Sequence, residues 1–176
     1  MCNVDINVIK EVTLVSFYTE TYEKYVENFV SNAERLSCKT YIEKKTEWKP
    51  KHNEQIKNQR HSNCKWKPSV VKSALSRNEI CLWLDIDCRI EKINYVPEKF
   101  DIGYFTNVPQ KYTNKISVGW IWFNNTPNTF KFLEQWEKNL IQSPQDHNAF
   151  TTTYKSRTNP ISLLDVTDSI QVIHNY

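Results

Sequence analysis

Apolar and polar positions alternate along this chain with two different periods, one typical of strands and one typical of helices. Residues 11–18 and 38–43 are short runs rich in β-branched and aromatic side chains, which predicts strands. Between them, apolar residues recur three and four positions apart over 22–33, which predicts an amphipathic helix. A strand, helix and strand in this order predict a β-α-β unit with its first strand near the middle of a sheet.

The most apolar run is Ile80–Leu84, where five residues without a helical period predict a strand buried on both faces. Pro68 is expected to open a short helix, and Thr126 is expected to cap a longer helix that begins at Pro127. Further predicted elements are strands at 100–106, 117–123 and 169–173, a helix from Ser143 through Phe150, and a long loop at 44–66. The alternation predicts an α/β fold, a single-domain three-layer α/β/α sandwich over 1–176 with a mixed, mainly parallel sheet.

Composition excludes several classes of site. The 176 residues include only two glycines, so neither a dinucleotide-binding glycine loop nor a Walker-type phosphate loop is present. The five cysteines are scattered without a Cys-x-x-Cys pair, which argues against a disulfide framework and fits a reducing compartment. No apolar run is long enough for a transmembrane segment and no signal-peptide pattern opens the chain, so we expect a soluble, cytoplasmic protein.

Two carboxylates, Asp85 and Asp87, follow the apolar strand directly. In open α/β sheets, ligands bind beyond the carboxyl ends of the strands. If the chain stays extended there, side chains two positions apart point to the same side, so the pair could hold one hard divalent cation and leave sites for phosphate oxygens. The alternative is that both aspartates only cap a turn. Carboxylates turned away from any cleft, or locked in ion pairs with lysine, would contradict the metal-binding prediction.

Charge is distributed unevenly. Residues 39–72 contain ten Lys and Arg against three Asp and Glu, whereas the remainder has a small negative balance. A basic segment beside an acidic pair fits a small polyanionic ligand bridged by a metal. Because Tyr41, Trp48 and Trp66 interleave with the lysines, a nucleic-acid-binding or carbohydrate-binding module is an alternative. A lysine-rich solvated loop would explain the segment equally well.

Several of these segments, taken together and in this order, resemble a nucleotide-sugar-dependent glycosyltransferase of the GT-A fold with a DxD motif. The segments are Val-Ser-Phe-Tyr-Thr at 15–19, Lys67-Pro68, Asp85-Ile86-Asp87, Val118-Gly119 through Thr126-Pro127, Phe132 through Trp136, and Gln145-Asp146-His147-Asn148. The resemblance implies a glycosyltransferase of the hexosyltransferase type. Such an enzyme moves a sugar from a nucleoside-diphosphate sugar, with a UDP-sugar favoured, to a hydroxyl acceptor such as a glycan.

The resemblance also implies roles for particular residues. Mn²⁺ or Mg²⁺ would be bound by the DxD pair, with Asp87 as the direct ligand and Asp85 reaching the ribose or the metal through water. The base and ribose would contact Phe17, Tyr18 and Thr19, while Lys67 would lie near the diphosphate and Ile86 within the nucleotide-sugar site.

Three further residues have alternative explanations. Gly119 would let a sugar approach the backbone, or it marks a simple bulge. Asp146 would be the general base beside the acceptor hydroxyl, or it completes a Ser-x-x-Asp capping box that begins at Ser143. His174 would be a third metal ligand, or an exposed residue near the chain terminus.

A haloacid dehalogenase-like phosphatase also carries Asp-x-Asp after an apolar strand. That class usually has the motif on its first strand, whereas here a β-α-β unit precedes it and Cys88-Arg89 follows it, so this class is disfavoured. No nucleic-acid partner is expected. The chain is short for a GT-A enzyme, so we expect a minimal acceptor site or one completed by a partner chain or an additional domain.

Overall fold

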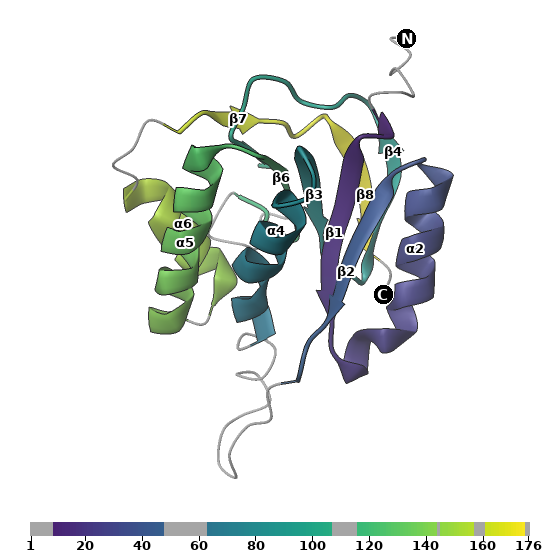
Figure 1. The fold of residues 1–176 in the computed structure, drawn as a ribbon, viewed down its shortest axis with the longest axis horizontal. Helices are drawn as coiled ribbons and strands as arrows, with labels where there is room; N and C mark the ends of the chain where they lie inside the picture. Colours follow the sequence, from purple (N-terminus) through teal and green to yellow (C-terminus); the bar gives the residue numbers. More distant parts are fainter. Residues whose placement is uncertain (1–8, 48–62, 107–115, 144, 157–160, 175–176) are drawn as a thin grey trace.

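The computed structural model describes residues 9–47, 63–106, 116–143, 145–156 and 161–174. Its main sheet has six strands in the order β2-β1-β3-β6-β5-β7 (Figure 1). The strands are β1 (Val12–Tyr18), β2 (Lys39–Lys44), β3 (Ile80–Leu84), β5 (Ile102–Tyr104), β6 (Trp120–Asn124) and β7 (Leu163–Asp165). The strand β1 is parallel to β2 and β3, β5 is parallel to β7, and only β6 runs antiparallel to its neighbours. The predicted mixed, mainly parallel sheet is therefore confirmed.

Helices cover both faces of this sheet. One face carries α4 (Lys67–Leu75), α5 (Pro127–Gln142) and α6 (Asp146–Ser156), while α2 (Val26–Arg35) lies on the other side (Figure 1). Two short 3₁₀ helices, η1 (Glu20–Tyr25) and η2 (Cys64–Trp66), precede α2 and α4. A two-stranded antiparallel ribbon of β4 (Cys88–Ile93) and β8 (Ile170–His174) packs with α2. These layers make the predicted α/β/α sandwich.

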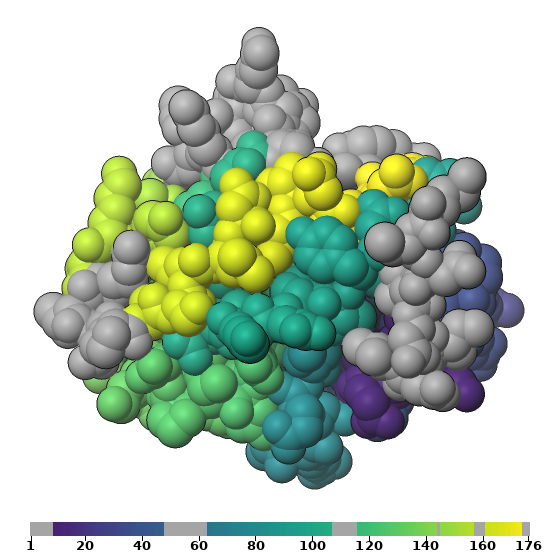
Figure 2. All heavy atoms as spheres, turned by 90° about the horizontal axis from the view of Figure 1, so that it is seen from above, coloured from purple at the N-terminus to yellow at the C-terminus, as the bar shows by residue number. Residues whose placement is uncertain are grey.

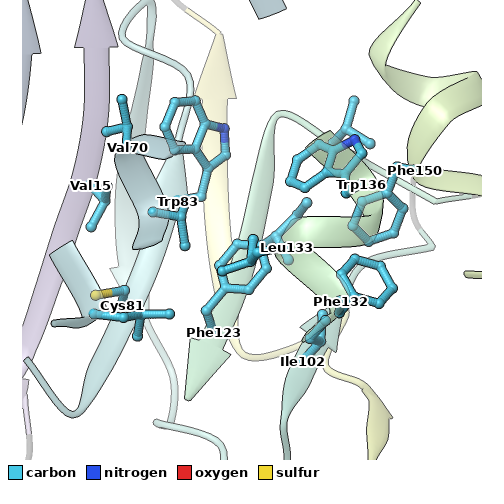
Figure 3. Packing of buried hydrophobic residues seen from close by; sticks show 14 of the residues in the cluster. Val15, Val70, Cys81, Trp83, Ile102, Phe123, Phe132, Leu133, Trp136 and Phe150 are labelled. Carbon is cyan, nitrogen blue, oxygen red and sulfur yellow. The ribbon is translucent and has the colours of Figure 1, made fainter. Parts of the chain in front are cut away.

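Aromatic side chains fill the layer between the sheet and α4, α5 and α6. The rings of Trp136 and Phe150 meet edge to face with their centroids 5.0 Å apart, and Trp83 of β3 is fully buried in the same cluster (Figure 3). Burying such large apolar surfaces is the main stabilising term for this layer. Because β3 is covered on both faces, its apolar run shows no alternation, as the sequence predicted.

The opposite face of the sheet is covered by α2 and the ribbon. Phe29 of α2 packs with Ile90 of β4 and Leu82 of β3 in a second buried cluster. The C-terminal segment, yellow in Figure 2, crosses one end of the molecule from the side of α6 before it enters β8. At that end the Trp122 Nε1–H donates a hydrogen bond to Ser169 Oγ at 2.9 Å, which fixes the segment to the main sheet.

Two strands were not predicted. The first, β4, alternates buried apolar and exposed charged residues from Cys88 to Glu91, which is a strand pattern, but it is short and follows the aspartate pair directly. The second, β7, has only three residues. The last predicted strand, 169–173, does form as β8, but its partner is β4 rather than the main sheet. Pairing of this kind depends on residues far apart in the chain, which local pattern does not determine.

Two helix starts also differ from prediction. The helix expected over 22–33 begins as the 3₁₀ turn η1 and becomes α-helical only at Val26. The helix expected from Ser143 starts at Asp146 and extends to Ser156, because Ser143 is instead the residue that ends α5. The proposed capping box from Ser143 to Asp146 is therefore wrong. The cap at Thr126 is confirmed, since its Oγ1 accepts a hydrogen bond from the Thr129 N–H.

None of the described helices is both long and apolar enough to cross a membrane. Among the described residues, Cys38, Cys64, Cys81 and Cys88 form no disulfide bond.

Candidate functional site

A cavity of about 330 Å³ opens at the carboxyl ends of β1 and β3. The predicted site residues that line it are Phe17, Tyr18, Thr19, Lys67, Asp85, Ile86 and Asp87. The lining residues that were not predicted are Thr21, Tyr22, Glu47, Asn63, Cys64 and Trp83. Small-molecule sites in α/β sheets commonly lie at this edge and have about this size.

The aspartate pair lies on a turn rather than on an extended strand. The strand β3 ends at Leu84, and the Cys88 N–H donates to the Asp85 carbonyl at 2.9 Å, which closes a turn over residues 85–88. The extended spacing expected from the sequence is therefore wrong. Both carboxylates nevertheless line the same cavity, because the turn places its two acidic side chains on the open side of the sheet edge.

Three neighbours fix the Asp85 carboxylate. Its Oδ1 accepts a hydrogen bond from Trp83 Nε1 at 3.1 Å and lies 2.9 Å from Lys67 Nζ. A side chain at Gly119 would place a Cβ 3.2 Å from Asp85 Oδ2, so the glycine leaves room for this carboxylate. The Asp85 N–H also donates to the Gly119 carbonyl at 2.7 Å. Gly119 itself does not line the cavity, so the contact that its small size permits in this structure is with Asp85.

Lys67 is a buried cation with three acceptors. Its side chain is only 5% exposed, and Nζ contacts Asp85 Oδ1, Asp146 Oδ2 at 2.6 Å and the Val118 carbonyl at 3.0 Å. The ammonium also lies 5.5 Å from the centre of the Trp83 ring. Burial alone would lower the pKa of Lys67, but the two carboxylates raise it well above its usual value. The lysine is therefore charged, and its position is set by its two anionic partners.

Asp146 is held by the same lysine from the first turn of α6. Its side chain is 7% exposed, and Oδ1 lies 3.3 Å from His147 Nδ1. Burial alone would raise the pKa of Asp146, yet Lys67 and His147 hold it well below its usual range. A carboxylate with a lowered pKa is a weak base, so the geometry favours an anchoring role. The predicted role as general base is not tested by these contacts.

The pKa of Asp85 moves in the opposite direction. Burial raises it, Lys67 works against this rise, and the neighbouring Asp146 and Asp87 add to it. Asp85 keeps 35% of its side chain exposed, in contrast to Asp146. The Asp85 carboxylate is thus close to Asp146 and Asp87 and shares Lys67 with Asp146. A further cation beside it would stabilise its charged form.

An ion pair with lysine was the arrangement expected to contradict metal binding, and Asp85 forms such a pair with Lys67. This contradicts the prediction that the Asp85 carboxylate is unpaired and open to a metal. Asp87 differs, because no described residue forms an ion pair with it. Its Oδ1 lies 3.8 Å from Cys88 Sγ, and its side chain is half-buried. Asp85 and Asp87 line the cavity and Asp146 contacts the same lysine as Asp85, so three carboxyl groups share this region with one ammonium.

Within the described ranges, no three His, Cys, Asp or Glu side chains converge to hold a metal. The backbone of His174 pairs with Cys88 across the ribbon, one residue from Asp87. The side chain of His174 lies outside what the structure describes, so its predicted role as a metal ligand stays a prediction. The backbone of His174 is nevertheless close to that of Asp87, because its pairing partner Cys88 directly follows Asp87.

Aromatic rings and a further carboxylate, Glu47, also line the cavity. The rings of Phe17 and Trp83 lie 5.8 Å apart, and Thr21 Oγ1 donates a hydrogen bond to Glu47 Oε1 at 2.7 Å. The buried Thr19 hydroxyl has no hydrogen-bond partner among the described residues. Trp83 could have been predicted as a lining residue, because it precedes Asp85 by two positions. Nothing in the sequence marked Glu47, which lies beyond β2 in a segment expected to be an irregular loop.

The basic segment does not form a continuous positive surface in the described part of the chain. Its described lysines are mostly paired with acidic side chains: Lys39 with Glu11, Lys44 with Glu23, Lys45 with Glu43, Lys67 with Asp85 and Asp146, and Lys72 with Glu137. Lys65 instead lies over the Trp66 ring at 4.7 Å. Trp48 lies outside the described residues. Paired and dispersed lysines favour the cavity over this segment as the ligand site.

Comparison with solved structures supports the fold. The chain is similar to the crystal structure of a glycosyltransferase involved in the glycosylation of the major capsid of PBCV-1, with a TM-score of 0.61 and 15% sequence identity. The similarity covers 93% of this chain and 91% of that one. No protein-family model matches this sequence, and no curated protein matches it. At this identity the likeness shows a shared α/β fold.

Proposed function

We propose that this chain is a metal-dependent glycosyltransferase of the GT-A type that takes its sugar from a nucleoside-diphosphate sugar. The observation that carries the proposal is a single cavity whose lining combines aromatic rings with Asp85 and Asp87. A nucleoside diphosphate needs both kinds of surface, since its base is flat and its phosphates require cations. The fold shared with a glycosyltransferase supports this assignment.

The proposed metal is Mn²⁺ or Mg²⁺, because Asp85 and Asp87 offer carboxylate oxygens to the cavity. Both ions prefer oxygen ligands, and Mg²⁺ in particular is commonly held by one or two carboxylates together with substrate phosphates. Asp87 is the proposed direct ligand because no described cation neutralises it, and His174 is the proposed third ligand from the paired strand. When bound, the metal would neutralise the diphosphate and stabilise the departing nucleotide.

Asp85 and Lys67 act together in this proposal. Trp83 and Lys67 hold one oxygen of Asp85, which leaves the carboxylate oriented toward the ribose or toward a water on the metal. Without a metal, the carboxylates of Asp85 and Asp87 would repel a diphosphate. We therefore expect nucleotide binding to depend on a divalent cation.

The aromatic rings of the cavity would receive the nucleoside. Phe17 and Tyr18 are half-buried and offer apolar surface to a base, and Thr19 lies beside them in the lining. A carboxylate accepts hydrogen bonds and donates none, so Glu47 requires an N–H or O–H donor on the ligand. A UDP-sugar satisfies this requirement through the uracil N–H or the ribose hydroxyls. We propose a glycan or another hydroxyl compound as acceptor.

The test is a thermal-shift screen of UDP-, GDP- and dTDP-sugars with and without Mn²⁺. A ligand at 100 times its dissociation constant adds about 2.7 kcal/mol of stability, so a true donor gives a clear shift that requires the metal. Asp87→Ala should abolish the Mn²⁺-dependent shift. Asp168→Ala is the matched control, because Asp168 is exposed at the far end of the ribbon from His174. No shift with any donor in the presence of Mn²⁺ would refute the proposed function.

A further inference from the structure

In the ribbon, β4 follows the turn that carries Asp87; one edge of β4 pairs with β8, the strand of His174, and the other edge faces a helix. On one side, β4 pairs with β8, and the register shifts between Ile90 and Lys92. On the other side, the amide of Asn32 in α2 donates to the Ile90 carbonyl at 2.8 Å and accepts from the Ile90 N–H at 2.9 Å. One side chain thus makes both hydrogen bonds that a third strand would make.

Asn32 is an unusual residue to bury in this position. It is 8% exposed, and the chain around it is the apolar cluster of Phe29, Ala33 and Ile90. A buried amide is stable there only because both of its polar groups are paired. Arg35, one turn later, donates from Nη2 to the same Ile90 carbonyl at 2.5 Å and to the Glu91 carbonyl at 3.1 Å. The helix therefore holds the backbone of β4 at two consecutive residues.

We infer that Asn32 is a positioning residue for the metal end of the cavity. Ile90 lies three residues after Asp87, and a two-stranded ribbon by itself is only marginally stable. The chain itself joins β4 to β3 and the Trp122–Ser169 hydrogen bond ties the segment before β8 to the main sheet, whereas the two Asn32 bonds tie β4 to α2. By holding Ile90, the two Asn32 hydrogen bonds position β4, and with it the turn that presents Asp87 and the paired strand that carries His174. They thereby set the spacing of the proposed metal ligands.

This inference rests on the proposed function, since it assumes that Asp87 binds a divalent cation. Residues that orient metal ligands through hydrogen bonds commonly change metal affinity by about 10–100-fold when they are replaced. Asn32→Ala should therefore raise the dissociation constant for Mn²⁺ by about tenfold or more. Arg35→Ala should give a smaller increase, because Arg35 is exposed and the two Asn32 bonds remain.

The experiment is titration with Mn²⁺ alone, followed by electron paramagnetic resonance of the free ion, on the full chain. Asn139→Ala is the matched control. Asn139 is a buried asparagine of α5 that donates to Thr153 Oγ1 at 2.8 Å, in the helical layer on the opposite face of the sheet. It should lose similar stability and keep wild-type Mn²⁺ affinity.

The outcomes separate the two proposals. If wild type binds no Mn²⁺, the metal dependence in the proposed function fails. If wild type binds Mn²⁺ and Asp87→Ala does not, but Asn32→Ala and Arg35→Ala both bind as wild type does, the positioning role is overturned. Equal weakening in Asn32→Ala and Asn139→Ala would also overturn it, because the effect would then follow from lost stability. Should Asn32→Ala fail to fold, the exposed Arg35→Ala decides.

Discussion

Replacing Lys67 by methionine tests the buried ion-pair cluster directly. The change keeps most of the side-chain volume but removes the charge between Asp85 and Asp146 and the hydrogen bond to the Val118 carbonyl. Asp146 is then a carboxylate with 7% of its side chain exposed and no lysine. Removing one partner of a buried ion pair costs about 3–5 kcal/mol, because the other charge stays uncompensated. For a chain of this length that is a fall in melting temperature of roughly 6–20 °C.

The magnitude can be divided by a double-mutant cycle with Asp146→Leu. Replacing both partners of a buried pair by apolar residues is often neutral, so Lys67→Met with Asp146→Leu should lose less stability than the two single changes added together. Urea unfolding at pH 7 would measure the three variants. A loss below about 1 kcal/mol for Lys67→Met is typical of exposed ion pairs. That result, or strict additivity in the cycle, would refute the view that Lys67 is the charge on which both aspartates depend.

Three further predictions concern neighbouring residues. Gly119→Ala should push the Asp85 carboxylate by a few tenths of an ångström, because the new Cβ would lie 3.2 Å from Oδ2. Nucleotide binding measured by calorimetry with Mn²⁺ should then weaken by about threefold to tenfold, which is about 0.7–1.4 kcal/mol, and unchanged affinity would contradict the contact. The lowered pKa of Asp146 contributes stability above the pKa of an unfolded aspartate, about 3.9, and this stability is lost as the pH falls toward the folded value. Urea unfolding of Asp146→Asn between pH 4 and 2.5 should therefore show a slope that is shallower by up to about 1.4 kcal/mol per pH unit, whereas parallel curves would show that the carboxylate is not perturbed. Glu47→Gln should weaken UDP binding by about tenfold, because a hydrogen bond to a charged acceptor contributes about 1.5 kcal/mol, and wild-type affinity would place the ligand elsewhere.

The elements that sequence predicted well are those whose own pattern determines them. Ile80–Leu84 forms β3 without any change of boundary, because a strand covered on both faces must be apolar at every position. The helix from Pro127 was predicted from a cap and a first-turn proline, both of which act within one turn. The position of Asp85 and Asp87 at the cavity followed from the same strand, since chain order alone places them at its carboxyl end.

The sequence could not predict which charges meet. Lys67 and Asp146 are 79 positions apart, and their contact at 2.6 Å exists only because α4 and α6 pack on one face of the sheet. The local pattern around Asp146 instead favoured a capping box, which the structure replaces with the ion pair. The turn at Asp85–Cys88 was the alternative interpretation of the aspartate pair, and the sequence could not decide for it because β4 depends on β8 as its partner strand.

What the sequence determined by itself is the α/β alternation and the pair of acids at one end of its most apolar strand, because both follow from periodicity over a few residues. Only the tertiary structure decided that Lys67 pairs with both Asp85 and Asp146 while Asp87 has no ion pair among the described residues. It also decided that Asn32 holds the backbone at Ile90. Contacts between distant segments depend on how the layers pack, and the energy that selects one packing is spread over the whole core rather than encoded in any single stretch.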